Sequence, residues 1–257
     1  MKMKNQHEFP WLEFVSLNET DSTNDQVHAL ASDREVLLVT AEYQTKGRGQ
    51  RGNSWESEPG KNLVFSMLIH PNYVASNEQF ILSQAISLAI QQTLSEMLKD
   101  NEVRIKWPND IYWKDRKICG ILIENSLMGR HIESSTLGVG ININQEKFCS
   151  NAPNPVSLYQ IMKQENDRTD ILLQIVKRFH DYLELLKQKE KSEIVRCYFE
   201  NLYRRDGYHK YRDQEGEFSA CITAIEPLGH LVLTDSEGRL RKYAFKEVAM
   251  VLPNCVI

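Results

Sequence analysis

Apolar residues in the first part of the chain cluster in short runs that predict β-strands. Each run is rich in Val, Ile, Leu or aromatic residues and is bounded by glycine, proline or charged residues, as strands usually are. The predicted strands span residues 36–43, 62–69, 103–107, 110–113, 117–125 and 136–143.

A short helix is predicted ahead of these strands, at residues 22–32. Ser22 or Thr23 is placed to cap its N-terminus, because serine and threonine side chains accept hydrogen bonds from the first free N–H groups of a helix. The apolar face of this helix would contain Val27, Leu30 and Ala31.

Longer helices are predicted where apolar residues recur every three or four positions. The segment 76–79, Ser-Asn-Glu-Gln, has the sequence of a capping box that opens the first of them. Its predicted core face consists of Ile81, Leu82, Ala85, Ile86, Ala89, Ile90, Leu94, Met97 and Leu98. A second helical region is predicted from residue 170 to about 202. Its inward residues would be Ile171, Leu172, Ile175, Val176, Phe179, Leu183 and Leu186.

The order of these elements predicts an α+β fold. Strands gather around helices without the regular βαβ alternation of a doubly wound sheet. After about residue 208 the pattern changes to short β segments at 218–225, 230–233 and 240–245, joined by turn-forming residues. We therefore expect a main domain at 1–208 and a small all-β domain at 209–257, a size at which an isolated core is marginal.

Composition indicates an ordinary globular protein. The chain has 257 residues, 41% of them hydrophobic, and a net charge of −4, so no overall basic field attracts nucleic acid. The five cysteines are scattered without a C-x-x-C pair, which argues against a zinc site and a disulfide framework. The N-terminus lacks the apolar run of a signal peptide, and no stretch is long enough to span a membrane. These features predict a cytoplasmic protein.

The stretch at 44–52, Gln-Thr-Lys-Gly-Arg-Gly-Gln-Arg-Gly, is a candidate anion-binding loop. Three glycines alternate with cations directly after a predicted strand. Glycine permits positive φ and close approach of a ligand to the main chain, and successive N–H groups in such a turn can form an anion-binding nest. A flexible surface loop has the same composition, so the loop alone does not establish a function.

Further motifs accompany this loop in a fixed order. The chain contains Asp21-Ser-Thr-Asn24 upstream, and downstream Trp55, Lys106-Trp-Pro-Asn-Asp110, Arg116-Lys-Ile-Cys-Gly-Ile-Leu-Ile-Glu124 and Gly138-Val-Gly-Ile-Asn142. Together they resemble the biotin protein ligases, enzymes that attach biotin to carboxylase subunits, over roughly residues 15–250. The resemblance implies a mixed, largely antiparallel sheet flanked by helices, like that of class II aminoacyl-tRNA synthetases. It also implies an SH3-like β-barrel as the C-terminal domain.

The resemblance further implies a biotin pocket and a nucleotide site. The residues implied for biotin are Ser22, Thr23, Asn24, Gln44, Gly47, Arg48, Lys117 and Gly120. Those implied for ATP are Arg48, Gln50, Arg51, Trp55, Lys106, Asn109 and Asn142, with the Trp55 ring stacked on adenine. Asn109 and Asp110 are expected to serve Mg²⁺, which takes one or two protein oxygens besides phosphates.

Catalysis in this family brings a carboxylate towards a polyphosphate, so fixed cations and backbone donors must stabilise growing negative charge. The resemblance assigns that role to Arg48 and Lys117, and Asp110 is conceivable as a base for the acceptor lysine. The chain departs from the family at Gln50, where many members have a second arginine. We expect this neutral side chain to leave retention of the adenylate more dependent on Arg48, Arg51 and Trp55.

Plainer explanations exist for the same residues. The Ser-Thr pair at 22–23 can cap a helix, and Lys117 can be a solvated cation at a strand edge. Trp107 can be a core residue. Lys106 and Asp110 can form an ion pair that closes a Pro-Asn-Asp turn.

The implied function is ATP-dependent conversion of biotin to biotinyl-5′-AMP and its transfer to a lysine of a biotin carboxyl carrier protein, with acetyl-CoA carboxylase as the expected acceptor. About twenty residues precede Asp21, too few for a helix-turn-helix domain, so we expect the single-function form, without a nucleic-acid or membrane partner. Whether it is a monomer or a homodimer stays open. The alternatives are a lipoate ligase of the same fold and a non-catalytic biotin-binding regulator.

Overall fold

The computed structural model describes residues 9–30, 32–49, 53–150 and 154–252. Two compact units account for the chain. The first comprises Met1–Ser76 and Arg116–Arg178, and the second comprises Asn77–Asp115 and Phe179–Ile257. These units differ from the two domains predicted from the sequence, 1–208 and 209–257. That domain boundary stays a prediction.

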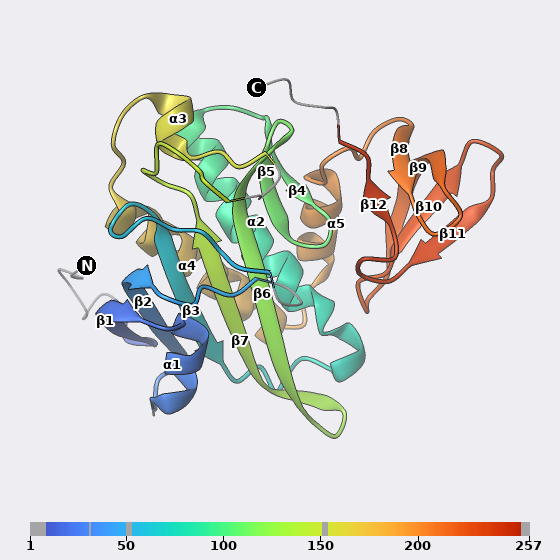
Figure 1. Cartoon of the computed structure of the whole chain (residues 1–257). Helices are drawn as coiled ribbons and strands as arrows, with labels where there is room; N and C mark the ends of the chain where they lie inside the picture. The colour runs from blue at the N-terminus through green and yellow to red at the C-terminus, as the bar shows by residue number, and fades with distance from the viewer. Residues whose placement is uncertain (1–8, 31, 50–52, 151–153, 253–257) are drawn as a thin grey trace. The chain divides into compact units, whose positions relative to one another are not determined.

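The first unit is built on a mixed sheet (Figure 1). Its strands are β1 (Leu12–Thr20), β2 (Val36–Gln44), β3 (Leu63–Ile69), β6 (Arg116–Met128) and β7 (His131–Ile141). They lie side by side in the order β1-β2-β3-β7-β6. Only β1 and β2 pair in parallel, and helix α1 (Thr23–Ala29) connects them, whereas the other neighbours are antiparallel.

Burial explains why β2 is central and why β1 escapes prediction. Residues 36–41 of β2 are all buried, as expected of a strand covered on both faces. In contrast, β1 mixes apolar and polar residues without a regular period, and only its end residues Leu12 and Thr20 are buried, so its apolar pattern predicts no strand. It forms because its backbone pairs with β2 in the register Leu12↔Val36 to Thr20↔Gln44.

Helix α1 is shorter than the sequence predicts. It ends at Ala29, and Leu30, expected on its apolar face, is 38% exposed, while Ala31 lies outside the described residues. Ser22 occupies the N-cap position but its side chain makes no capping hydrogen bond. Val27 is fully buried and packs against Leu37 and Val39 of β2, which fixes α1 on the sheet.

In the second unit, helix α2 (Phe80–Leu98) is followed by the hairpin of β4 (Val103–Lys106) and β5 (Asp110–Trp113). The capping box predicted at 76–79 is wrong. A 3₁₀ turn, η3 (Ser76–Glu78), precedes the helix, and the N-cap residue Gln79 makes no side-chain capping bond. The predicted core face of α2 is buried up to Leu94, and Met97 and Leu98 near its end are half-buried.

The single helical region predicted from 170 to about 202 is two helices, α4 (Arg168–Lys187) and α5 (Ser192–Glu200). The polar Gln-Lys-Glu-Lys segment at 188–191 separates them, and Lys189 within it has a φ of 64°, a left-handed conformation that interrupts a helix. All seven residues predicted to face inwards from this region are buried. The apolar period therefore predicts the buried face correctly but does not predict the interruption at 188–191.

The C-terminal part of the second unit is an antiparallel sheet with the strand order β11-β10-β9-β8-β12. These strands are β8 (His209–Arg212), β9 (Glu217–Ile225), β10 (Leu231–Asp235), β11 (Leu240–Tyr243) and β12 (Ala249–Met250). Trp107 donates its indole N–H to the Gly229 carbonyl at 2.9 Å, and Phe245 packs on Trp107 and Phe80. The sheet thus shares its core with α2 and the β4–β5 hairpin.

None of the helices in the described ranges combines the length and apolar character needed to cross a membrane.

Candidate functional site

Two glycines give the first unit a patch of backbone without side chains on strands β6 and β7. Gly120 and Gly140 are direct partners in the antiparallel register. A Cβ atom at Gly140 would lie 2.3 Å from Trp55 Cε2, and one at Gly120 would lie 2.9 Å from Trp55 Cζ3. The indole of Trp55 therefore lies directly on a floor that only glycine permits. The motif Arg116–Glu124 predicts Gly120 as a site residue, but its pairing with Gly140 is evident only from the sheet.

Trp55 is held there by its backbone and by contacts with the glycine loop. Its N–H donates to the Gly47 carbonyl at 3.0 Å, and a Cβ atom at Gly47 would lie 2.8 Å from the Trp55 carbonyl oxygen. Among the described residues, the buried indole Nε1 has no hydrogen-bond partner. An unpaired buried donor is unfavourable by about 1–3 kcal/mol, so this N–H is available to an incoming acceptor.

The two cations predicted for catalysis are held in different ways near Trp55. Arg48 forms an isolated β-bridge with Ser54, the neighbour of Trp55, and its Nη2 lies 2.6 Å from Asp25 Oδ1 on α1. Lys117 Nζ lies 5.9 Å from the centroid of the Trp55 ring system, a cation–π separation. The fold thus brings Lys117 of β6 to the Trp55 ring, whereas the Arg48 guanidinium, on the loop after β2, is paired with α1. Gln50 and Arg51, also predicted for ATP, lie outside the described residues.

Lys117 is anchored through its backbone. Its N–H donates to the Asn154 carbonyl at 2.8 Å, and its own carbonyl accepts from Val156 N–H at 2.9 Å. A Cβ atom at Gly120 would lie 3.3 Å from Lys117 Nζ, so the ammonium group extends over the glycine floor. Lys117 is half-buried, and its role in the site stays a prediction.

Asn142 lies at the end of the same floor and offers a free acceptor. It is 3% exposed, and its Nδ2 donates to the Val156 carbonyl at 3.1 Å. Within the described part of the chain its Oδ1 is buried and has no partner. The segment 154–158 therefore holds both Lys117 and Asn142, because Val156 hydrogen-bonds with each of them.

A second cluster of predicted residues surrounds the N-terminus of α1. Ser22, Thr23 and Asn24 are each at most 4% exposed. Thr23 donates its backbone N–H to Gln44 Oε1 at 2.7 Å, and its Oγ1 lies 3.0 Å from the same oxygen. Four of the predicted biotin residues are thus brought together, and the helix-cap explanation for Ser22 fails because its side chain makes no capping bond.

Two residues that were not among the predicted site residues complete this cluster. Ser66 on β3 is fully buried, lies 2.7 Å from Thr23 Oγ1 and donates to Asn24 Oδ1 at 2.5 Å. Glu124 on β6 accepts from Asn24 Nδ2 at 2.8 Å. Gly138 makes room for this arrangement, since a Cβ atom there would lie 2.2 Å from Asn24 Oδ1.

Hydrogen bonds and an ion pair with Asp21 fix the start of the glycine loop. The Thr45 hydroxyl and the Lys46 ammonium donate to the Asp21 carboxylate and hold its pKa below the ordinary value. The Thr45 and Lys46 backbone N–H groups donate to the Thr20 and Asp21 carbonyls. The first half of the loop is thus tied to the segment that leads into α1.

Lys106, Asn109 and Asp110 belong to the second unit. Asn109 is 5% exposed, and Lys106 and Asp110 are partners across the β4–β5 hairpin. Lys106 Nζ lies 5.4 Å from the centroid of the Tyr112 ring. Trp107 is 5% exposed and packs as described above, so the core explanation holds for it. The roles of the other three with ATP and Mg²⁺ stay predictions.

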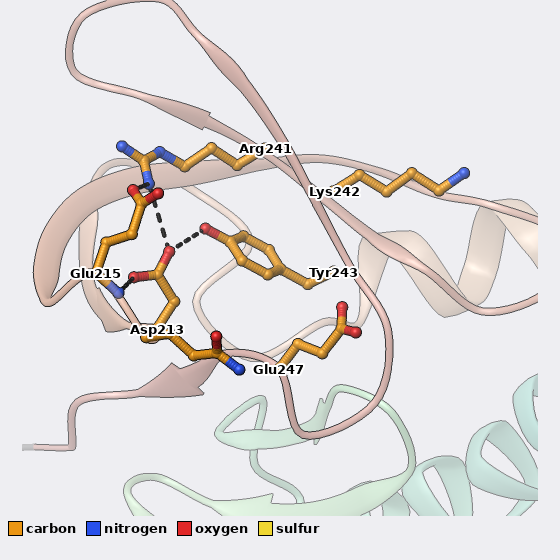
Figure 2. A pocket seen from close by; sticks show the side chains of 7 residues that line it. Asp213, Glu215, Arg241, Lys242, Tyr243 and Glu247 are labelled. Atoms are coloured by element: carbon orange, nitrogen blue, oxygen red, sulfur yellow. Dashed lines mark hydrogen bonds and ion pairs between the residues drawn. The ribbon is translucent and has the colours of Figure 1, made fainter.

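A separate cavity of about 370 Å³ lies in the C-terminal sheet (Figure 2). Its lining residues include Asp213, Arg241 and Tyr243. The Tyr243 hydroxyl donates to Asp213 Oδ2 at 2.6 Å, and Arg241 Nη1 lies 3.4 Å from the same oxygen. The polar groups here pair with one another, and none of the predicted site residues lies among them.

Comparison with known proteins agrees with this geometry. Residues 12–142 match the model of the biotin/lipoate A/B protein ligase family. The bifunctional ligase/repressor BirA of Bacillus subtilis is 32% identical over 236 residues, which covers 87% of this chain and 70% of the relative. The biotin–[acetyl-CoA-carboxylase] ligase of Paracoccus denitrificans is 30% identical over 131 residues, which covers 49% of this chain and 53% of the relative.

Among solved structures, the biotin protein ligase from Aquifex aeolicus in complex with biotin and ATP has a TM-score of 0.78 and 25% identity, and the match covers 93% of this chain and 99% of that one. The α+β fold with a mixed sheet and a second antiparallel sheet is thereby confirmed. Together with the site around Trp55, these matches establish that the chain belongs to the biotin/lipoate A/B protein ligase family.

Proposed function

We propose that this protein is a biotin–protein ligase that activates biotin with ATP and transfers it to a lysine of a biotin carboxyl carrier domain. The observation that carries the proposal is the glycine floor of Gly120 and Gly140 beneath Trp55, with Lys117 extending over it. In the first step a biotin carboxylate oxygen attacks the α-phosphorus of ATP, and the bond to the β-phosphate breaks. Biotinyl-5′-adenylate and pyrophosphate are formed.

The biotin site would be the cluster around α1. A fused cyclic urea has two N–H donors and one carbonyl acceptor, and each must be paired when buried. Thr23 and Gln44 present oxygen acceptors, Ser22 adds a hydroxyl, and Asn24 ties the start of α1 to β3 and β6. The resemblance also assigns Gly47 and Gly120 to this pocket, and a side chain at either position would meet Trp55.

The nucleotide site would be the neighbouring end of the glycine floor. The Trp55 ring offers a stacking surface, and the unpaired Asn142 Oδ1 can accept from the exocyclic amine of adenine. Arg48 can fork onto phosphate or carboxylate oxygens in a planar geometry. We also assign Gln50, Arg51 and Lys106 to ATP, on the resemblance of their motifs alone.

Electrostatic stabilisation explains the need for two cations. Biotin carboxylate and the α-phosphate repel each other, and donors fixed in a site of low water content stabilise charge that develops in the transition state. Lys117 is the compact charge that would lie between the two acids, and Arg48 would bind the outer oxygens. The pair resembles an oxyanion site made of side chains rather than of backbone.

Asn109 and Asp110 are proposed to serve Mg²⁺ and the transfer step. They offer an amide and a carboxylate oxygen at adjoining positions, the donor types that Mg²⁺ prefers. When bound, Mg²⁺ would neutralise charge on the pyrophosphate. In the transfer step, the acceptor lysine amine attacks the acyl carbon, the bond to AMP breaks, and Asp110 would take the proton that the amine loses.

We propose acetyl-CoA carboxylase as the source of the acceptor domain, because the Paracoccus relative is named for that substrate. A cytoplasmic location would suit the four described cysteines, which are free thiols. Whether the active form is a monomer or a homodimer is left to measurement of its mass in solution.

The test is transfer of labelled biotin to a purified carrier domain in the presence of ATP and Mg²⁺. We expect Lys117→Ala to lower kcat/KM for adenylation by about 10²–10³-fold, the loss typical of a removed transition-state donor. Lys114→Ala, an exposed lysine nearby in sequence, is the matched control and should retain full activity. Equal activity of Lys117→Ala and wild type would overturn the assignment.

The same assay separates the alternatives. A lipoate ligase would label the acceptor with lipoate and not with biotin. A non-catalytic regulator would bind biotin but release no pyrophosphate when ATP is added.

A further inference from the structure

Four oxygen atoms form a line inside the proposed biotin cluster. Thr23 Oγ1 lies 3.0 Å from Gln44 Oε1 and 2.7 Å from Ser66 Oγ, and Ser66 Oγ lies 2.5 Å from Asn24 Oδ1. Each separation is short enough for a hydrogen bond. The three contacts share only two protons, those of the Thr23 and Ser66 hydroxyls. One contact must therefore be without a proton.

Both ends of the line are fixed as acceptors. Gln44 Oε1 accepts the Thr23 backbone N–H at 2.7 Å, so the amide group of Gln44 cannot turn its NH₂ towards Thr23 without opposing that N–H and leaving it unpaired. Asn24 Nδ2 donates to Glu124 Oε2 at 2.8 Å, and an ionised carboxylate can only accept. Glu124 thereby obliges Asn24 to present its oxygen to Ser66.

The separations indicate which contact has no proton. Hydroxyl hydrogen bonds are usually 2.7–2.8 Å long, so the contacts at 2.5 Å and 2.7 Å need the two protons, and the contact at 3.0 Å is left without one. Ser66 then donates to Asn24, and Thr23 donates to Ser66. Thr23 Oγ1 and Gln44 Oε1 remain as two adjacent acceptors with no hydrogen between them.

We propose that Glu124, acting through Asn24 and Ser66, is a positioning residue that turns the Thr23 hydroxyl away from Gln44. The result is a pair of acceptor oxygens that a neutral N–H donor can satisfy. A ring N–H of a cyclic urea is such a donor, whereas a dithiolane ring has none. The inference deepens the proposed function and rests on it, because it names how the same pocket selects biotin over lipoate.

Replacement of the Glu124 carboxylate by an amide would reverse the direction of the hydrogen bonds along this row of oxygen atoms. In Glu124→Gln the new NH₂ can donate to Asn24 Oδ1, which frees the Asn24 amide to turn and donate to Ser66. Ser66 then donates to Thr23, and Thr23 donates to Gln44. All three contacts have protons in this state, but Gln44 Oε1 now accepts twice and has no capacity left for a ligand.

The experiment measures biotin affinity by titration calorimetry and thermal unfolding of the full chain. We expect Glu124→Gln to weaken biotin binding about 3–10-fold, the range of one hydrogen bond, while the melting temperature stays the same or rises. Glu133→Gln on the neighbouring strand β7, whose carboxylate accepts from Ser126, is the control and should leave both unchanged. Ser66→Ala should weaken biotin in the same way, because Thr23 then has only Gln44 to donate to.

Two cyclic carbamate analogues of biotin, each with one ring N–H replaced by oxygen, complete the test. One of the two analogues lacks the ring N–H that donates to Thr23 and Gln44. Glu124→Gln and wild type should bind that analogue with equal affinity. Wild-type affinity for biotin in Glu124→Gln would overturn the inference and leave the ligase function standing. Equal weakening for biotin and both analogues, with a lower melting temperature, would show a merely structural role. Failure of the wild-type chain to bind biotin would count against the proposed function itself.

Discussion

At the scale of single residues, Gly138 and Gly140 control two different halves of the proposed site. They are two positions apart on β7, so they lie on the same face of the sheet. A side chain at Gly138 would meet Asn24, and one at Gly140 would meet the Trp55 ring. The same substitution at each position should therefore disturb a different substrate.

We expect Gly138→Ala to raise the KM for biotin and Gly140→Ala to raise the KM for ATP, each by about tenfold or more, because an added methyl group in a filled space displaces its neighbour. Steady-state kinetics with each substrate varied in turn would check this, and each variant is the control for the other. The pocket assignment would be contradicted if both variants raised the same KM.

The site residues differ in how far the sequence could reveal them. Thr23, Gln44 and Lys117 lie in motifs with recognisable residue types and order. Ser66 belongs to an ordinary strand sequence, and Glu124 closes the Arg116–Glu124 motif, which by itself gives that residue no role in the site. They are recognisable only when β3 and β6 are seen on either side of Asn24.

At the scale of elements, helix α3 (Leu158–Met162) and the segment before it support the nucleotide half of the site. A capping box is present here, since Ser157 Oγ accepts from Gln160 N–H and the Gln160 side chain accepts from Ser157 N–H. Ser157 Oγ also donates to the Gln145 carbonyl at 2.6 Å. This short helix therefore fixes the segment that hydrogen-bonds with Lys117 and Asn142.

Ser157→Ala should lower the free energy of unfolding by about 1–2 kcal/mol, the usual loss for a removed cap, and raise the KM for ATP. Denaturant unfolding and ATP kinetics would measure the two effects. Ser126→Ala, an exposed position on β6, is the control and should change neither. An unchanged KM in a destabilised Ser157→Ala variant would show that the segment does not support the site.

Helix ends were the least predictable elements, for physical reasons. The apolar period identified the inward faces of α2 and α4, because burial of those faces drives their packing. The capping box predicted at 76–79 failed because the chain enters α2 through a 3₁₀ turn. Such local competition between turn types depends on contacts that the segment alone does not specify.

At the scale of the whole molecule, the lowered pKa of the Asp235 carboxyl links stability to pH in acid. Burial would raise the pKa of Asp235, but hydrogen bonds from the Arg239 backbone and from the Arg241 and Arg239 guanidinium groups outweigh it and lower the pKa. A carboxyl group with a lower pKa in the folded state stabilises the fold above its unfolded pKa. That contribution is lost as the pH falls through the folded value.

We therefore expect the free energy of unfolding to be constant near neutral pH. It should decrease once the pH is below 3.8, the ordinary pKa of aspartate. Asp235→Asn should lower the melting temperature at pH 7 and flatten the fall in acid, because the group that titrates is gone. Thermal unfolding between pH 7 and pH 3 would check this. Asp206→Asn, at an 89% exposed side chain, is the control; a fall as steep in Asp235→Asn as in wild type would contradict the prediction.

The sequence by itself determined the family, the class of fold and most of the elements, because residue order and apolar period are local properties of the chain. Only the tertiary structure decided which polar groups meet. Asn24 contacts Ser66 and Glu124 across 42 and 100 residues, and Gly140 supports Trp55 from a distant strand. Strand pairing fixes those partners, and a pairing between distant segments is set by the packing of the whole sheet rather than by either segment.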